Sequence, residues 1–327
     1  PREAPRLPLL LFAGVLIAAV VGALAFGVRR GRSVEETTPP PVTKAGETPS
    51  AQPDGEWVLP GAPGRIAFGR AREGGYDLFA ATLDGAPPQP LISGGDDIAP
   101  AWSADSRRLA ISHQDSDGRG IFIGTPEDPA SQRISPPGVT ARYAAWSPDG
   151  RQVAFVDDVN GRSLQMVDLS SGQVRELGPQ RLGWLSWRNG ALLYAAKLSA
   201  GAPQDLFALG DDGVSINLTN TPGVEEDFPD RSPDGRRIAF VASPPGEANL
   251  PQRQIFAIDA DGGNPTQLTH TQGPHTNPVW SPDGKWIAYL SKASGGEWQV
   301  WAMRADGSEP RQLTFEPEQK FYLAWGE

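Results

Sequence analysis

Cysteine is absent from this 327-residue chain, and histidine is scarce. The lack of cysteine excludes disulfides, thiolate metal sites and cysteine nucleophiles together. The three histidines, His113, His270 and His275, form no His-Glu-x-x-His pattern. Neither a Gly-x-Ser-x-Gly elbow nor a Gly-x-x-x-x-Gly-Lys-Ser/Thr loop occurs. We therefore expect a protein that is not an enzyme, with no catalytic residues, no cofactor and no metal.

Acidic turns leave one alternative open. The segments 115–118, 211–213 and 259–262 each carry two aspartates before a glycine. Clustered carboxylates suit calcium, but none of these segments continues into a twelve-residue calcium loop with its final glutamate. Asp-Gly is also the ordinary turn of a β-hairpin, which is the interpretation we favour.

Positive charge is also scarce, because the net charge is −10. Residues 1–32 hold five arginines and one glutamate, so they carry +4 and the remainder carries −14. Nucleic-acid binding depends on neutralising phosphates with basic side chains. We therefore expect no nucleic-acid partner.

The segment Leu7–Val28 contains 22 residues without a charge. As a helix it would rise about 33 Å, enough to cross a bilayer core. We predict a single transmembrane helix at 7–28, followed by a Pro/Thr-rich linker at 29–60. A cleaved signal peptide is the competing interpretation, since Ala23-Leu24-Ala25 resembles a cleavage site, but the apolar run is long for a signal core.

Small residues in this segment fall four apart, at Gly14, Ala18 and Gly22. Such spacing lets two membrane helices approach closely, although glycine and alanine are also simply common there. Arginines flank both ends, so they leave the orientation open. We expect the domain that follows to be extracytoplasmic, either periplasmic or at the cell surface.

A repeated motif occupies the rest of the chain. Trp-Ser-Pro-Asp-Gly occurs in full at Trp146–Gly150 and Trp280–Gly284, and imperfectly elsewhere. Successive copies are 44, 41, 44, 49 and 45 residues apart, a period that indicates one supersecondary unit per copy. The anchor residues of the six copies are Trp102, Trp146, Trp187, Arg231, Trp280 and Trp325.

Arg231 replaces the anchor tryptophan in one copy. A tryptophan there should pack between neighbouring units and bury about 150–250 Å². The arginine should weaken that seam unless it stacks on a neighbour or pairs with Asp230 or Asp234.

Each copy predicts four short antiparallel strands, which make one blade of a β-propeller. In the copy at Trp146 a tight turn precedes the apolar runs 153–156, 164–167 and 174–177. The last copy has only its first strand, and the residues before Trp102 supply the other three. We therefore predict an all-β, six-bladed propeller over residues 61–327, closed by pairing of 321–325 with 66–69.

The repeat resembles the TolB-like family of WD-type propellers. Its pattern of Pro-x-Trp-Ser-Pro-Asp-Gly-Arg/Lys-x-Ile-Ala-Phe, followed by a Gln-Leu-Thr strand, appears in Pro278–Tyr289 with Arg311–Thr314. It appears again in Pro229–Phe240 with Thr266–Thr269. The resemblance covers residues 61–327, and it implies a six-bladed fold that serves as a binding platform.

The loops that enter the innermost strands should line one mouth of the central channel. They carry mixed charges and aromatic side chains, which could grip a peptide or a partner loop. They could equally be solvated and variable. The candidate partner-binding residues are Asp97, Arg142, Tyr143, Trp184, Glu225, Glu226, Asp227, His275, Asn277 and Lys320.

Together these features predict a membrane-anchored, non-enzymatic protein-interaction scaffold, an accessory or assembly subunit of a larger membrane complex. The expected partners are other membrane protein subunits, bound through the helix and a propeller face, and the lipid bilayer. The alternative is a tethered extracytoplasmic receptor that binds a peptide or glycan at the channel mouth.

Overall fold

The computed structural model describes residues 29–30, 57–93, 98–159, 162–178, 182–243, 253–293 and 296–327. Within these ranges the chain forms strands and turns but no helix. None of the described segments is therefore a helix long and apolar enough to cross a membrane. The predicted helix 7–28, with Gly14, Ala18 and Gly22, lies outside the described residues, as does most of the linker 29–60.

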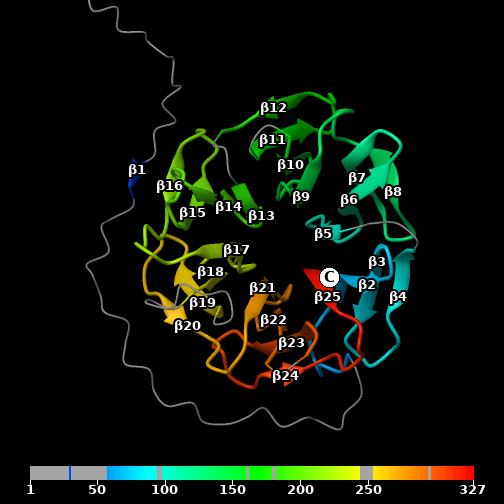
Figure 1. Ribbon diagram of the computed structural model, residues 1–327, viewed down its shortest axis with the longest axis vertical. Coiled ribbons are helices and arrows are strands. Elements are labelled where there is room, and N and C mark those ends of the chain that lie inside the picture. The colour runs from blue at the N-terminus through cyan, green and yellow to red at the C-terminus, as the bar shows by residue number, and fades with distance from the viewer. Residues whose placement is uncertain are drawn as a thin grey trace, which may run out of the picture.

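Six sheets stand around a ring, and each holds one blade of four strands; one sheet gains a fifth, short strand at its outer edge (Figure 1). We number the blades I to VI in ring order, starting from the sheet that holds both ends of the domain. The innermost strands of blades I to VI are β25 (Lys320–Gly326), β5 (Ile98–Trp102), β9 (Ala141–Trp146), β13 (Leu182–Ser186), β17 (Glu226–Arg231) and β21 (His275–Trp280). The second strands are β2 (Arg65–Arg72), β6 (Leu109–Asp115), β10 (Gln152–Asp157), β14 (Leu192–Lys197), β18 (Arg237–Ala242) and β22 (Trp286–Ser291).

The outer half of each blade follows the same order. The third strands are β3 (Gly75–Thr82), β7 (Gly118–Thr125), β11 (Ser163–Asp168), β15 (Gln204–Leu209), β19 (Gln254–Asp259) and β23 (Gln299–Arg304). The outermost strands are β4 (Gln89–Ile92), β8 (Asp128–Arg133), β12 (Val174–Glu176), β16 (Ser215–Asn217), β20 (Thr266–Gln267) and β24 (Arg311–Gln312). One further short strand, β1 (Arg29–Arg30), pairs in parallel with β16.

The hydrophobic core lies in the seams between blades. In β10 the run Val153–Val156 is buried on both faces, because each sheet packs against two neighbours. The outermost strand β12 is largely exposed. Each of the six seams holds one cluster of buried apolar side chains. A single blade could not bury its own faces, so the ring is the folding unit.

The ring closes through the two ends of the domain. Strand β25 pairs antiparallel with β2, with Trp325 opposite Ile66 and Phe321 opposite Gly69. Figure 1 shows the red β25 beside the blue β2. This is the pairing that the sequence predicts, and it leaves no open edge between the first and last blades.

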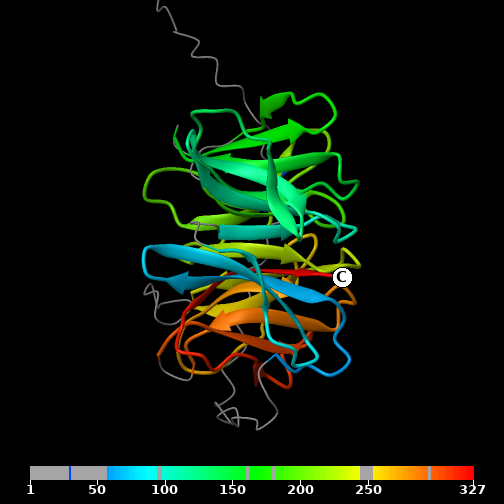
Figure 2. The ribbon, with the colours of Figure 1, turned by 90° about the vertical axis from the view of Figure 1, so that its right-hand side faces the viewer.

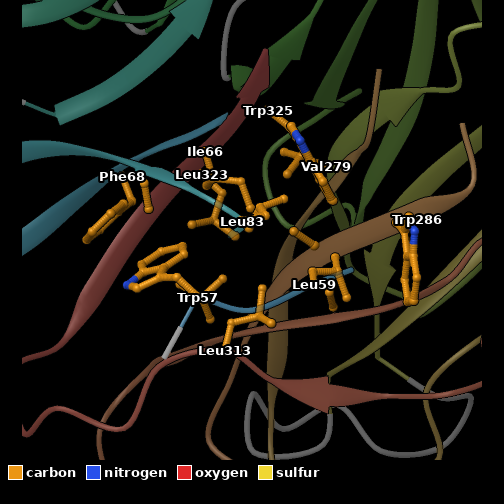
Figure 3. Close-up of a cluster of buried hydrophobic side chains, with 14 of the residues drawn as sticks. Trp57, Leu59, Ile66, Phe68, Leu83, Val279, Trp286, Leu313, Leu323 and Trp325 are labelled. Carbon is orange, nitrogen blue, oxygen red and sulfur yellow. The ribbon is translucent and has the colours of Figure 1, made fainter. Parts of the chain in front are cut away.

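The domain begins earlier than the predicted boundary at residue 61. Trp57 and Leu59 are buried in the core between blades VI and I (Figure 3). The Trp57 ring stacks on Phe68 at 4.7 Å, and its backbone N–H donates to the Leu313 carbonyl over 2.7 Å. Residues 57–60 therefore belong to the propeller and not to the linker.

The propeller has two distinct faces, because strands alternate in direction. The Ser-Pro-Asp-Gly turns after the innermost strands open on one side, which we call the turn face. Loops that lead into the innermost strands, and loops between second and third strands, open on the other side, which we call the loop face. Figure 2 shows the ring from the edge, with the two faces on opposite sides.

Candidate functional site

The anchor tryptophans connect neighbouring blades by hydrogen bonds. In three blades the indole Nε1–H donates to a carbonyl of the preceding blade's innermost strand: Trp102 to Ala324 (3.3 Å), Trp146 to Ala101 (3.1 Å) and Trp280 to Asp230 (3.1 Å). Trp325 donates instead to the Pro63 carbonyl over 2.9 Å. The repeated tryptophan is therefore a structural residue of the seams.

Blades IV and V lack this connection. Trp187 Nε1 donates to Gly190 of its own turn over 3.1 Å, and Arg231 Nη1 donates to Gly235 of its own turn over 3.3 Å. Arg231 forms no ion pair with Asp230 or Asp234, and burial lowers its pKa. Asp230 joins the blades instead.

The Asp230 carboxylate reaches both neighbouring blades. Its Oδ1 accepts from Ser186 Oγ over 2.9 Å, and its Oδ2 accepts from the Trp280 N–H over 2.8 Å. A polar contact therefore replaces the missing indole bond between blades IV and V.

Each innermost strand carries a β-bulge before its anchor. The ladder register shifts there in blades II to VI and also in blade I. The residue three positions before the anchor has a positive φ in five blades, at Ala99, Tyr143, Phe228, Asn277 and Tyr322. Bulges commonly re-aim a side chain, and here they present one residue per blade at the same level of the ring.

Four of the six residues at this level are aromatic and contact one another across the channel. We call Tyr143, Trp184, Phe228 and Tyr322 the aromatic plug. The Trp184 ring centroid lies 5.0 Å from Tyr143, 5.0 Å from Phe228 and 5.7 Å from Tyr322. Trp184 and Tyr322 are nearly parallel and come from opposite blades, IV and I, so their contact crosses the axis.

The plug is half-buried, and its environment disfavours charge. Burial raises the pKa of Tyr143 and raises that of Tyr322 to about 12. Both phenols are therefore neutral at ordinary pH. The sequence predicted Tyr143 and Trp184 as mouth residues and missed Tyr322; Phe228 ends the segment 223–228, whose acidic residues were candidates. Aligning the third residue before each anchor would have found all four.

Asp227 positions two members of the plug. Its Oδ1 accepts from the backbone N–H groups of Trp184 (3.2 Å) and Phe228 (2.8 Å). Two other candidates form ion pairs on the loop face: Arg142 with Asp158 at 3.2 Å and Glu225 with Lys197 at 2.8 Å. Asp97 lies outside the described residues.

Four other candidates are buried structural residues rather than mouth loops. Glu226, His275 and Lys320 begin the innermost strands, and Asn277 lies within one. Lys320 Nζ pairs with Glu316 at 2.9 Å, and Asn277 Oδ1 accepts from the Leu323 N–H over 2.6 Å. Because these side chains fill seams, they do not present a surface to a partner.

His275 and Glu226 show the effect of this burial on titration. Burial lowers the pKa of His275 to about 4. Burial raises the pKa of Glu226 to about 8, and the charge of Asp205 acts in the same direction. Glu226 Oε2 and Asp205 Oδ1 are both buried without a hydrogen-bond partner. The seam between blades IV and V thus holds a pair of carboxyl groups that favours a bound proton.

The loop face also exposes large apolar side chains. Val159 is 56% exposed, Leu198 61% and Phe315 44%. Val159 and Leu198 lie in corresponding loops of the adjacent blades III and IV. The other large apolar side chain exposed in the described residues, Ile216 at 39%, lies on the outermost strand β16.

In the acidic turn at Asp115, the carboxylate binds groups of the protein itself. Asp115 pairs with Arg133 at 2.6 Å, and its Oδ1 also accepts from the Asp117 N–H. No group of three or more His, Asp or Glu side chains in those ranges is arranged to hold a metal ion.

Comparison with known proteins places this fold among propellers. A family profile described as the TolB beta propeller domain matches residues 211–325. An uncharacterized protein of Agrobacterium fabrum is 25% identical over 262 residues, which cover 75% of this chain and 84% of that protein. The Tol-Pal system protein TolB of Desulfosudis oleivorans is 36% identical over 83 residues, 25% of this chain and 16% of that protein.

The chain is also similar in fold to solved structures and in sequence to a peptidase. The crystal structure of TolB from Acinetobacter baumannii superposes with a TM-score of 0.69 at 23% identity, covering 81% of this chain and 68% of that one. An uncharacterized peptidase of Bacillus subtilis is 34% identical over 155 residues, 44% of this chain and 20% of the peptidase. The similar proteins therefore include TolB proteins and a peptidase.

Proposed function

Because the described domain is a TolB-like six-bladed β-propeller, we propose that this chain is a membrane-anchored, non-enzymatic protein-interaction scaffold. In this proposal it is an accessory or assembly subunit of a larger membrane protein complex, with its propeller on the extracytoplasmic side. The partner protein docks on the loop face.

The observation that carries the proposal is the exposure of Val159 and Leu198. Each leaves apolar surface in water, and the two loops occupy corresponding positions in the adjacent blades III and IV. Exposed apolar surface rimmed by polar groups marks protein interaction sites. Here the rim includes the ion pairs Arg142–Asp158 and Lys197–Glu225.

The aromatic plug places four rings in mutual contact at the centre of the loop face. Trp184 contacts three other rings, so the channel mouth offers aromatic side chains and not an open passage. Aromatic residues dominate the energetics of protein interfaces because they bury large areas with few rotatable bonds.

Two features of the sequence support the membrane complex. The segment 7–28 has the length and apolarity of a membrane anchor. Gly14, Ala18 and Gly22 have the spacing of a helix-packing face, which would hold the anchor against a partner's helix.

The test is co-purification of the full chain from its native membrane in mild detergent. We expect other membrane subunits to co-migrate with it, and the Val159→Glu, Leu198→Glu double variant to lose them. Ile216→Glu is the matched control, because it adds a charge at an exposed apolar position on the outer strand. Co-migration that survives the double variant, or a single free species in the unaltered chain, would contradict the proposal.

A tethered receptor for a peptide or glycan is the second candidate, and the aromatic plug favours it. Rings half-open at a channel mouth can stack on a sugar or hold an extended peptide. Trp184→Ala would then abolish binding of the peptide or glycan, whereas Val159→Glu with Leu198→Glu would leave that binding unchanged.

A further inference from the structure

The turn face holds a cavity that the proposed partner does not use. Its volume is about 220 Å³, and residues from all six blades line it. Its walls mix polar and apolar surface, and the proline of three repeat turns enters it at Pro148, Pro233 and Pro282. Four anchor tryptophans complete the walls: Trp102, Trp146, Trp187 and Trp325.

In blade IV a shortened repeat places the guanidinium of Arg188 in the lining of this cavity. Blade IV has the turn Trp187-Arg188-Asn189-Gly190 where other copies have Trp-Ser-Pro-Asp-Gly. Arg188 reaches across the mouth, with Nη1 donating to the Trp280 carbonyl over 3.2 Å and Nη2 to the Trp325 carbonyl over 3.0 Å. A guanidinium has five N–H donors, so these two bonds fix its position and leave others for a ligand.

Two further guanidinium groups lie against tryptophan rings of the wall without lining the cavity themselves. Arg65 lies 4.5 Å from the Trp102 ring centroid, and Arg108 lies 4.4 Å from that of Trp146. The opposing charges are Glu327, which is exposed at the lining, and Asp230, whose charge interacts with Arg188. Among the lining residues the charged side chains are Arg188 and Glu327, so the preference for an anion is carried by the fixed N–H donors of Arg188.

We propose that this cavity binds a small organic carboxylate with a flat or apolar body. The carboxylate accepts hydrogen bonds from Arg188, since a guanidinium matches its geometry. The body packs on the proline and tryptophan walls. The volume of about 220 Å³ is sufficient for a small aromatic carboxylate such as benzoate.

Calorimetric titration of the full chain with sodium benzoate tests this site, with benzamide as the neutral ligand of the same shape. We expect saturable benzoate binding, and binding of benzamide about tenfold weaker or more. Arg188→Gln should remove this preference for the carboxylate. Arg237→Gln is the matched control, because Arg237 lies on the turn face and donates to Ala305 but does not line the cavity.

Arg188→Lys keeps the proposal testable if the glutamine variant unfolds. It retains the charge and should bind benzoate more weakly than the unaltered chain but still more tightly than benzamide. Absent binding, equal affinity for benzoate and benzamide, or an undiminished preference in Arg188→Gln would overturn the proposal. Because this cavity is on the turn face, its failure leaves the loop-face proposal untouched.

Discussion

Glu226 has an unusually high pKa for a glutamate, and the corresponding positions of two other blades hold different residues. Its equivalents in blades VI and I are His275 and Lys320, which find partners within their own seams. Glu226 instead lies near Asp205, where neighbouring blades have Gln254 and Gln299. The amides of those glutamines donate to loop carbonyls, whereas Asp205 has no proton to donate when it is ionised.

This pair makes the stability of the fold depend on pH. The pKa of Glu226 is about 8 in the folded protein, against 4.5 for an ordinary glutamate. Between these values the folded state keeps a proton that the unfolded state releases. The free energy of unfolding therefore falls as pH rises from about 4.5 to about 8.

Glu226→Gln should remove this contribution, because the neutral amide needs no proton and can donate to Asp205 Oδ1. The stability advantage of the variant should grow with pH and reach on the order of a few kcal/mol above pH 8. Urea denaturation between pH 6.5 and 8 isolates the effect, since His275 contributes with the opposite sign at lower pH. Glu225→Gln is the control; parallel pH curves for Glu226→Gln and the unaltered chain would refute this explanation.

The sequence located the residues that enter the innermost strands but not which of their side chains are buried. Counting back from each anchor identified these residues. It did not show that the first of them points into a seam, because burial depends on the neighbouring blade. Arg188 was missed for the same reason: its partners, Trp280 and Trp325, are distant in the chain.

The closing sheet is the element on which the ring depends. Gly64 precedes β2 with φ of +80°, and a Cβ there would overlap the carbonyl oxygen of Gly326 in β25. Gly61, three residues earlier, has φ of +75° and open space around it. Both glycines have a positive φ, but of the two only Gly64 lies against the closing strand β25.

Gly64→Ala should therefore destabilise the propeller more than Gly61→Ala does. Gly61→Ala carries only the cost of positive φ, about 1–2 kcal/mol. Gly64→Ala must also displace β25, so we expect an additional loss of about 2 kcal/mol or more. Urea denaturation measures both; equal losses would show that closure contributes little to stability.

Blades were predictable because each is specified by local signals. A turn motif, three apolar runs and a regular period are enough to define four strands and the closure. The start of the domain was not predictable in this way. Trp57 precedes β2, where the first apolar run of the propeller begins, and its packing on Phe68 shows that it belongs to the core.

At the scale of the whole molecule, blades IV and I are tied together across the axis at both mouths. Trp184 stacks on Tyr322 near the loop face, and Arg188 donates to Trp325 at the turn face. Contacts between these two opposite blades therefore cross the channel near each of its two ends. One carries aromatic rings beside exposed apolar loops, and the other carries a small cavity with a fixed cation.

The central claim is that a partner protein docks on the loop face. Site-specific photocrosslinking in native membranes tests it most directly, with the crosslinker at positions 159 and 198 on the loop face and at 236 and 285 on the turn face. We predict covalent adducts with a different membrane protein from the two loop-face positions and none from the turn face. Adducts formed equally from both faces, or none from positions 159 and 198, would contradict the account.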